Sequence, residues 1–239
     1  MKLITSNTAV DAEAYSKHTQ FYTQEIPFLL RDFLGGNQWQ RCVELGCGDG
    51  SLFHALNQAG YFEDKTVCAL DLSETRIKRI KAATGDNECL VADACRTPLK
   101  DESCEFLFSS QVIEHVHSDE EMVREIRRVL APNGIVYLAT VFKKWYGWYF
   151  YRCNGKWTLD PTHVREYNHD KQLLDILERS GLEVLENRKS LDGRPVLDAV
   201  LRRIGASRKI YDNRFLRLLR AIRVPIFGYY IWEIVCRKR

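Results

Sequence analysis

The sequence predicts an α/β protein built on one doubly wound, mostly parallel sheet with helices on both faces. Short apolar runs at residues 41–45, 66–70, 104–109 and 135–141 alternate with amphipathic helical patterns, which is typical of parallel βαβ units. The first of these runs passes directly into a glycine-rich loop that opens a helix. The length of 239 residues suits one large domain with additional segments.

The expected elements follow one another without internal repeats. Residues 1–37 are expected to form a helical lid, and residues 142–168 an insert after the fifth strand. Strands are expected at residues 41–45, 66–70, 88–91, 104–109, 135–141 and 182–188. Helices are expected at residues 51–59, 73–83, 119–130 and 169–180.

Composition narrows the class of protein. The eight cysteines include no C-x-x-C pair and several lie in apolar runs, which predicts free thiols in a reducing cytoplasm and no metal site. The first residues contain no apolar block, which disfavours a signal peptide. No run approaches the roughly 20 apolar residues that a spanning helix needs. The sequence therefore predicts a cytoplasmic protein.

The glycine-rich loop is the most informative segment. Residues 43–50 read VELGCGDG, so glycines alternate with other residues between a strand and a helix. Glycine permits positive φ and leaves room for a ligand close to the backbone. A dinucleotide site has the spacing G-x-G-x-x-G, whereas this loop has G-x-G-x-G with acids at Glu44 and Asp49. These acids would repel a pyrophosphate and favour a ligand that carries a sulfonium and an ammonium group.

Two further strand ends carry polar groups that suit a nucleoside. Asp71 ends the second strand, where its carboxylate can accept hydrogen bonds from both ribose hydroxyls. Asp93 follows the third strand, at the edge where an adenine would lie. Together with the acidic glycine loop, these positions favour a charged amino-acid nucleoside over a nicotinamide cofactor.

With these motifs in order, residues 38–190 resemble the class I S-adenosylmethionine-dependent methyltransferases. The segments that carry the resemblance are VELGCGDG, ALDLS, VADA, FLFSSQVIEHV and RVLAPNGIVYLAT. The resemblance implies a Rossmann-like fold whose sheet ends in an antiparallel edge pair, within a domain at residues 38–200. Residues 182–188 are the candidate for the sixth strand, and residues 195–201 could supply the seventh.

The resemblance also implies the cofactor and its contacts. S-adenosylmethionine is the expected cofactor. Glu44, Gly46 and Gly48 are expected to surround its methionine part, Asp71 to hold the ribose, and Asp93 with Ala94 to contact the adenine. Further expected cofactor contacts are Cys47, Leu72 and Gln111.

The acceptor is expected to meet the segment that follows the fourth strand. Residues 111–116, QVIEHV, are similar to the corresponding segment of the quinone-biosynthesis O-methyltransferases. Those enzymes often carry a carboxylate where this chain has Gln111, and the substitution argues against carrying over a metal site. His115 is a catalytic candidate and Glu114 an acceptor contact; the alternative is that both simply orient the loop.

The insert supplies the other acceptor candidates. His163 could act as a base or contact the acceptor, and Arg165 could bind an anionic group, although packing of His163 is the competing interpretation. Trp145 begins a run of aromatic residues that could line an apolar acceptor pocket, contact a membrane or pack in the core. Tyr15, in the expected lid, could close over the site.

The last 39 residues are strongly basic. Residues 201–239 contain eleven Lys or Arg against Asp212 and Glu233, and apolar residues alternate with arginine at helical spacing. The pattern favours an amphipathic helix lying on the inner face of a membrane through residues 210–239. Packing on the domain or in a dimer is the second interpretation, and nucleic-acid binding is disfavoured. On the membrane interpretation, deleting residues 210–239 would abolish membrane binding and spare cofactor affinity.

The sequence thus predicts an S-adenosylmethionine-dependent methyltransferase that acts on a small, apolar or lipid-like acceptor by in-line methyl transfer. The alternative is a catalytically silent nucleotide-binding protein that its basic tail recruits to a membrane or a partner. The two differ in one property, transfer of the methyl group to an acceptor.

Overall fold

The computed structural model describes most of the chain. The described residues are 25–84, 87–149, 151–153, 156–160, 162–195, 197, 214–220 and 222–239. The expected lid residues 1–24, with Tyr15, lie outside this part.

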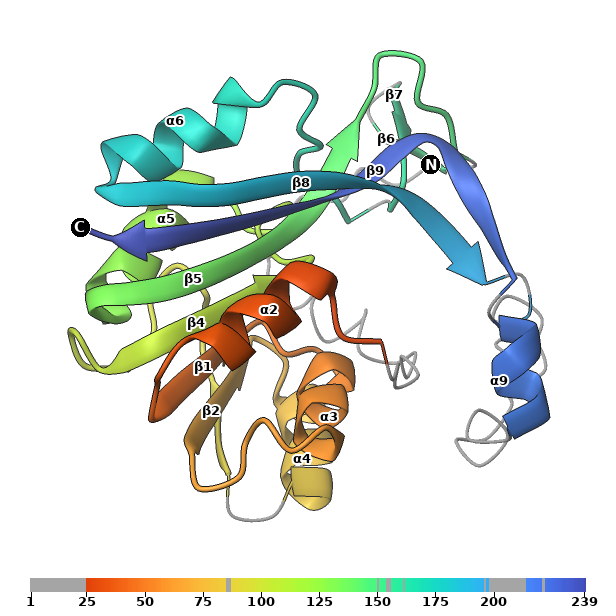
Figure 1. The fold of residues 1–239 in the computed structure, drawn as a ribbon. Helices are drawn as coiled ribbons and strands as arrows, with labels where there is room; N and C mark the ends of the chain where they lie inside the picture. Colours follow the sequence, from red (N-terminus) through yellow and green to blue (C-terminus); the bar gives the residue numbers. More distant parts are fainter. Residues whose placement is uncertain are drawn as a thin grey trace.

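One seven-stranded sheet forms the centre of the molecule, in the order β3-β2-β1-β4-β5-β9-β8 (Figure 1). Its first five strands in this order are parallel, while β9 runs antiparallel to both β5 and β8. The strands are β1 Arg41–Leu45, β2 Thr66–Asp71, β3 Glu88–Val91, β4 Cys104–Ser110, β5 Leu130–Lys143, β8 Leu182–Pro195 and β9 Arg223–Lys238. The predicted doubly wound sheet with an antiparallel edge pair is confirmed.

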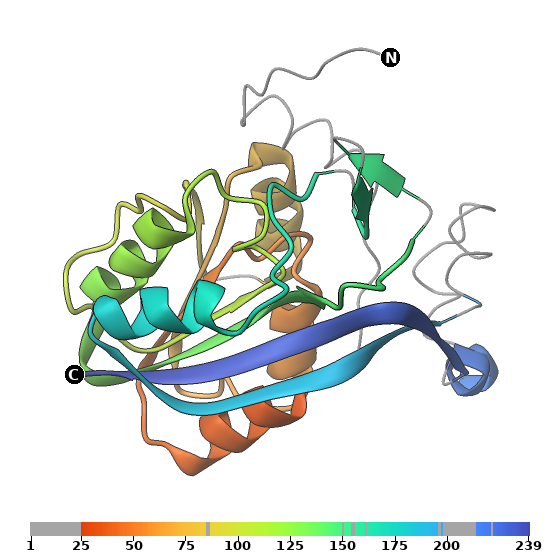
Figure 2. The same ribbon diagram turned by 90° about the horizontal axis from the view of Figure 1, so that it is seen from above.

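Helices cover both faces of this sheet (Figure 2). Apolar residues of α2 (Phe28–Gly36), α3 (Ser51–Gln58) and α4 (Glu74–Thr84) share one buried cluster. Those of α5 (Asp119–Val129) and α6 (Lys171–Arg179) share the cluster on the opposite face. α2 buries Leu29, Leu30 and Leu34 in the core, so residues 28–36 of the expected lid pack on the domain, and the lid itself stays a prediction.

Local sequence explains the position of α5. The hydroxyl of Ser118 accepts a hydrogen bond from the backbone N–H of Glu121, which caps the helix. Three acidic residues occupy the first turn and two arginines the last, as the helix dipole favours. Its buried residues recur at helical spacing: Met122, Val123, Ile126 and Val129.

The basic tail provides the seventh strand. Residues 135–143 of β5 pair with residues 229–237 of β9, and Trp232, Ile234 and Val235 are fully buried. Two expectations were therefore wrong: residues 195–201 as the seventh strand, and a separate interfacial helix that includes residues 223–238. A strand buried on both faces is apolar without strict alternation, so its pattern resembles that of a buried helix.

The β8–β9 hairpin extends beyond β5 at one end of the sheet. Gly193 pairs with Pro225 and Arg194 with Val224, past the last β5–β9 pair, and the helix α9 (Arg214–Arg220) lies at this tip (Figure 1). Nearby, β6 (Tyr151–Cys153) and β7 (Lys156–Thr158) form a small separate hairpin within the predicted insert. Among the described residues, no helix is long and apolar enough to cross a membrane.

Candidate active site

The glycine loop packs tightly at the carboxyl end of β1. Gly46, Gly48 and Gly50 all have positive φ, and the backbone N–H groups of Gly46 and Cys47 both donate to the Leu70 carbonyl at 2.8 Å. A Cβ atom at Gly46 would lie 2.3 Å from Cγ2 of Val112, on the loop after β4. Only glycine therefore allows these two loops to approach each other.

Asp71 joins the first two strand ends. Its Oδ2 accepts a hydrogen bond of 2.8 Å from the Gly48 N–H, and its Oδ1 accepts one of 2.9 Å from the Ser73 N–H. Leu72 lies between these anchored residues, and Arg76 places its guanidinium 3.8 Å from the same carboxylate. The residue predicted to hold a ribose thus also fixes the shape of the glycine loop.

The two acids of the loop differ in their surroundings. Glu44 is buried, and its Oε2 has no hydrogen-bond partner within the described residues. Burial, and then the charge of Asp71, raise its pKa well above the usual range. A cationic ligand group beside Glu44 would lower the free energy needed to ionise this buried carboxyl. Asp49 instead pairs with Arg79 at 2.8 Å, so the expectation that both acids serve the ligand is not met by Asp49.

The ends of β3 and β4 complete this edge of the sheet. Asp93 accepts a hydrogen bond from the Cys95 N–H at 2.8 Å, which shapes the turn that contains Ala94. Gln111 has a φ of 59°, and its Nε2 is buried without a partner among the described residues. Unpaired buried polar atoms at Gln111 and Glu44 fit a polar ligand along the strand ends.

Glu114 lies on the acceptor side of the site. It is fully buried, its Oε2 accepts a hydrogen bond from the Thr140 hydroxyl at 2.8 Å, and its Oε1 has no partner among the described residues. Burial raises its pKa to about 7, and the neighbouring His163 opposes the shift. This carboxyl therefore exchanges its proton near neutral pH.

Arg165 holds the backbone of the loop that follows β4. Its Nη1 donates to the carbonyls of Ile113 and Val116 at 2.7 Å, and its Nη2 donates to the carbonyl of His117 at 2.9 Å. These bonds engage the guanidinium with loop backbone, and its Nε lies 3.5 Å from Oδ2 of Asp119. Binding of an anionic acceptor by Arg165 stays a prediction. Arg165 positions the loop that carries Glu114 and His115.

The two candidate histidines lie against each other. The rings of His115 and His163 meet edge-on with centroids 4.8 Å apart. Nδ1 of His115 lies 3.1 Å from the Thr162 hydroxyl. Burial, and then His163, lower the pKa of His115 to about 4, so this ring is neutral at pH 7. The sequence placed these residues in separate segments, and the fold brings them together.

Glu166 is a site residue that the sequence reasoning missed. Its Oε1 lies 3.0 Å from Nδ1 of His163 and accepts hydrogen bonds from the Leu159 N–H and the Thr158 hydroxyl. Burial opposes its ionisation, but these hydrogen bonds, His163 first, together hold its pKa below the usual range. Its spacing of three residues from His163 was the available signal.

The aromatic run divides between surface and core. Trp145 is 93% exposed, and its ring meets that of Tyr146 edge-on with centroids 5.4 Å apart, so it lies on the surface. Tyr149, in contrast, packs against the buried cluster of Val141, Leu159, Ile226 and Tyr229. Core packing thus applies to Tyr149, while contact of Trp145 with an acceptor or a membrane stays a prediction.

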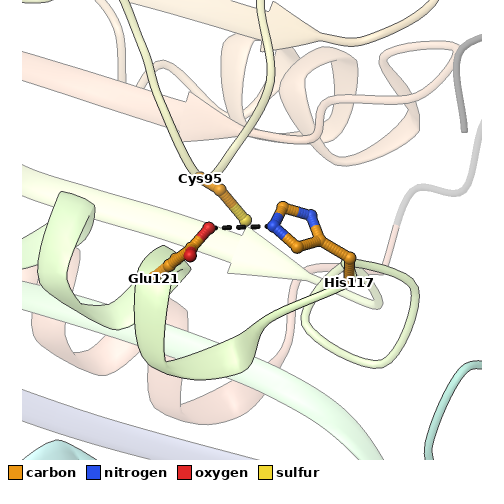
Figure 3. A group of neighbouring side chains, drawn as sticks. All are labelled: Cys95, His117 and Glu121. Atoms are coloured by element: carbon orange, nitrogen blue, oxygen red, sulfur yellow. Dashed lines mark hydrogen bonds and ion pairs between the residues drawn. The ribbon is translucent and has the colours of Figure 1, made fainter.

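Within the part of the chain that the structure describes, two groups of side chains have the spacing to hold a metal ion. Glu114, His115 and His163 form one, and Cys95, His117 and Glu121 the other, each with ligand atoms within 4.8 Å of one another. Figure 3 shows the Cys95 thiol directed toward the 2.8 Å hydrogen bond between His117 and Glu121. This second group is partly exposed beside a cavity of about 450 Å³ that Asp93 also lines. The prediction of no metal stays a prediction.

Comparison with known proteins agrees with this geometry. The family described as "Methyltransferase domain" matches residues 43–138. The malonyl-[acyl-carrier protein] O-methyltransferase of Marinomonas sp. is 28% identical over 191 residues, which is 75% of this chain and 66% of that protein. The ubiquinone biosynthesis O-methyltransferase of Bartonella tribocorum is 22% identical and covers 61% of each chain. The predicted resemblance to the class I S-adenosylmethionine-dependent methyltransferases is thus confirmed.

Solved structures show the same fold. A methyltransferase from Methanosarcina mazei superposes with a TM-score of 0.61 at 16% identity, covering 90% of this chain and 98% of the other. The chain spans between about half and two thirds of the length of the first curated relatives it matches. The family and its cofactor, S-adenosylmethionine, are thus confirmed, while the residue assignments remain predictions.

Proposed function

We propose that this protein transfers the methyl group of S-adenosylmethionine to a hydroxyl oxygen of a small apolar acceptor. One observation carries the proposal beyond the family: His163 is paired with the ionised Glu166 beside the loop that follows β4. The relatives named malonyl-[acyl-carrier protein] and ubiquinone biosynthesis O-methyltransferase support transfer to oxygen. A hydroxyl acceptor must lose its proton during methyl transfer, and a histidine paired with a carboxylate can accept that proton.

The strand ends would hold the cofactor, which supplies a methyl group activated by its sulfonium. In this proposal Glu44 faces the cationic methionine part, Asp71 accepts from the ribose hydroxyls, and Asp93 lies at the adenine. Gly46 and Gly48 leave space for the ligand at the backbone. These residues align S-adenosylmethionine and complement its charges, and they take no part in forming or breaking bonds.

His163 is the proposed base. With its Nδ1–H donating to Glu166, its Nε2 is the atom that accepts the acceptor's proton, and the carboxylate stabilises the charged ring that results. His115, neutral at pH 7, packs against this ring and limits its orientation. Glu114 is proposed to contact the acceptor, with its protonation state set by burial.

The proposed acceptor is apolar, and we propose that the protein meets it at the cytoplasmic surface of a membrane. The insert that carries His163 also carries the aromatic run of residues 145–151. Aromatic side chains at the entrance of a site favour an apolar substrate and are enriched at membrane interfaces.

Calorimetry with S-adenosylhomocysteine tests the cofactor half. The intact protein should bind it, and Asp71→Ala should weaken binding at least about tenfold, the equivalent of one hydrogen-bonded charge. Asp175→Ala, an exposed acid on α6, is the matched control and should bind as the intact protein does. Unchanged binding by Asp71→Ala would contradict the assignment.

Incubation with methyl-labelled cofactor and separated lipid and aqueous extracts tests the transfer. Label should enter the lipid fraction, and His163→Gln should reduce its rate by about 100-fold or more while leaving S-adenosylhomocysteine binding unchanged. Glu166→Gln should show a smaller loss with a shifted pH profile, and His169→Gln serves as the exposed control. Binding without transfer to any fraction would instead favour the catalytically silent alternative.

A further inference from the structure

The tip of the β8–β9 hairpin exposes a cluster of large apolar side chains. They belong to α9, to the first residues of β9 and to Ile222 just before that strand. The exposed residues are Phe215, Leu218, Leu219, Ile222, Val224 and Phe227, four of them more than 60% exposed. Such a cluster on the surface of a protein marks a site of contact.

The same segment is strongly basic. Arginines stand at positions 214, 217, 220 and 223, and no acidic residue occurs between positions 214 and 232. Apolar side chains combined with arginine match a surface that is apolar beneath an anionic layer. An ordinary protein partner requires no such combination, whereas a bilayer with anionic lipid has both properties.

The aromatic loop continues this surface. The Lys144 N–H donates to the Gly228 carbonyl at 2.8 Å, and the rings of Tyr146 and Phe227 lie 5.1 Å apart. A Cβ atom at Gly228 would lie only 2.4 Å from Cα of Gly147, so the loop rests directly on β9. Trp145, 93% exposed, therefore projects from an edge that is anchored to the hairpin.

The exposed apolar surface lies at the same end of the sheet as the candidate active site. Figure 1 shows the tip with α9 at the end of the sheet toward which β4 and β5 point. Parallel strands place their ligand sites at that end. The aromatic loop also leads along the chain from β5 to His163, so one insert joins the exposed surface to the proposed base.

We propose that residues 144–148, 214–220 and 222–227, the docking edge, bind the surface of an anionic lipid bilayer. The proposal rests on the proposed function in that an apolar acceptor would reach His163 from this membrane. The contact is peripheral: apolar side chains enter the headgroup boundary, and the basic sequence of the segment favours anionic headgroups. It replaces the amphipathic tail helix predicted from sequence with a hairpin tip fixed to the catalytic domain.

Vesicle flotation of the full-length protein tests the docking edge. The protein should float with vesicles of phosphatidylcholine and phosphatidylglycerol, bind weakly to phosphatidylcholine alone, and be released in part by salt. Trp145 should be quenched by brominated lipid, and Trp145→Phe should remove that quenching. No flotation with anionic vesicles overturns the proposal.

A matched pair of variants locates the contact. Phe215→Gln with Leu218→Gln should weaken anionic-vesicle binding at least about tenfold, since each side chain contributes by apolar burial. Phe28→Gln, an equally large exposed aromatic on α2, should bind as the intact protein does. Equal binding by the double variant overturns the proposal, as does an equal loss in Phe28→Gln.

The outcomes separate this proposal from the proposed function. S-adenosylhomocysteine binding should be the same in the double variant and the intact protein, which shows that the variant is folded. Normal cofactor binding without flotation rejects the docking edge alone, whereas failed cofactor binding by the intact protein rejects the enzyme. Concentration-dependent self-association that the double variant abolishes, without vesicle binding, would assign this surface to a second copy of the chain.

Discussion

At the scale of residues, the conformation of the cofactor loop depends on glycines, which have no Cβ atom. Gly46 and Gly48 share a positive φ but differ in their neighbours, because only Gly46 faces Val112. The sequence motif names both glycines and does not distinguish them. The difference arises from the loop after β4, which lies more than 60 residues away along the chain.

Replacing these glycines should separate backbone strain from steric overlap. Gly48→Ala should cost about 1 kcal/mol of stability from left-handed strain alone. Gly46→Ala should cost about 1–3 kcal/mol more, because its Cβ overlaps Val112, and should weaken S-adenosylhomocysteine binding. Urea unfolding measures both. Adding Val112→Ala should restore part of the Gly46→Ala loss, and equal losses at the two glycines would contradict the steric argument.

Glu114 should make stability depend on pH. Its folded-state pKa of about 7 lies above the ordinary 4.5, so the folded protein binds more protons than the unfolded chain between these values. Stability from this group is therefore present below pH 4.5 and lost as pH rises to about 7.

Urea unfolding of the intact protein and Glu114→Gln, with a chelator present, measures this effect. The intact protein should lose about 3 kcal/mol relative to the variant across this range, an order-of-magnitude figure. His115, with its lowered pKa, acts in the opposite direction in both proteins and so largely cancels from the difference. Parallel curves for the two proteins would show that Glu114 titrates normally.

At the scale of elements, the site is assembled from loops that the sequence separates. Residues 113–117 and 158–166 meet through Arg165 and through the ring contact of His115 with His163. The motif after the fourth strand predicted a functional loop there. It did not predict that an arginine from the insert binds the backbone carbonyls of this loop. Every residue has a backbone carbonyl, so the sequence does not show which ones accept hydrogen bonds.

Arg165→Lys should expose this positioning role. Lysine keeps the charge but lacks the planar fork that reaches the carbonyls of Ile113, Val116 and His117 together. We expect a stability loss of about 1–3 kcal/mol and faster hydrogen exchange in residues 113–117. Arg179→Lys, an exposed site on α6, is the control. Retention of full protection in Arg165→Lys would contradict the assignment.

At the scale of the whole molecule, the end of the chain completes the core. β9 lies between β5 and β8, and the hydroxyl of Tyr137 on β5 donates to Glu233 on β9 at 2.9 Å. Lys238 donates to the Leu130 carbonyl at 2.7 Å, which ties the last residues to the start of β5. The strand is thus an interior part of the domain.

Truncation of the chain should show that β9 is needed for the domain to fold. Deleting residues 223–239 leaves β5 and β8 without their shared partner, so we expect loss of the cooperative thermal transition and of S-adenosylhomocysteine binding. The double variant Phe215→Gln with Leu218→Gln should keep both, because these side chains are exposed. A folded, cofactor-binding truncation product would contradict the central place of β9. Selective loss of membrane binding on truncation, expected from sequence alone, is not expected from this fold.

The sequence by itself determined the parallel half of the fold, the family and the cofactor. These depend on local patterns: strand, glycine loop and helix lie next to one another along the chain, and β1 and β3 begin and end at the predicted residues. Tertiary structure alone decided the rest. Whether residues 223–238 form a helix or a strand depends on pairing with β5, more than 80 residues away, and with β8. The bond from Arg165 to Ile113 in the loop after β4 joins residues 52 positions apart, and His163 contacts the same loop through His115. An apolar run shows that a segment is buried, but only the packed molecule determines which surface buries it.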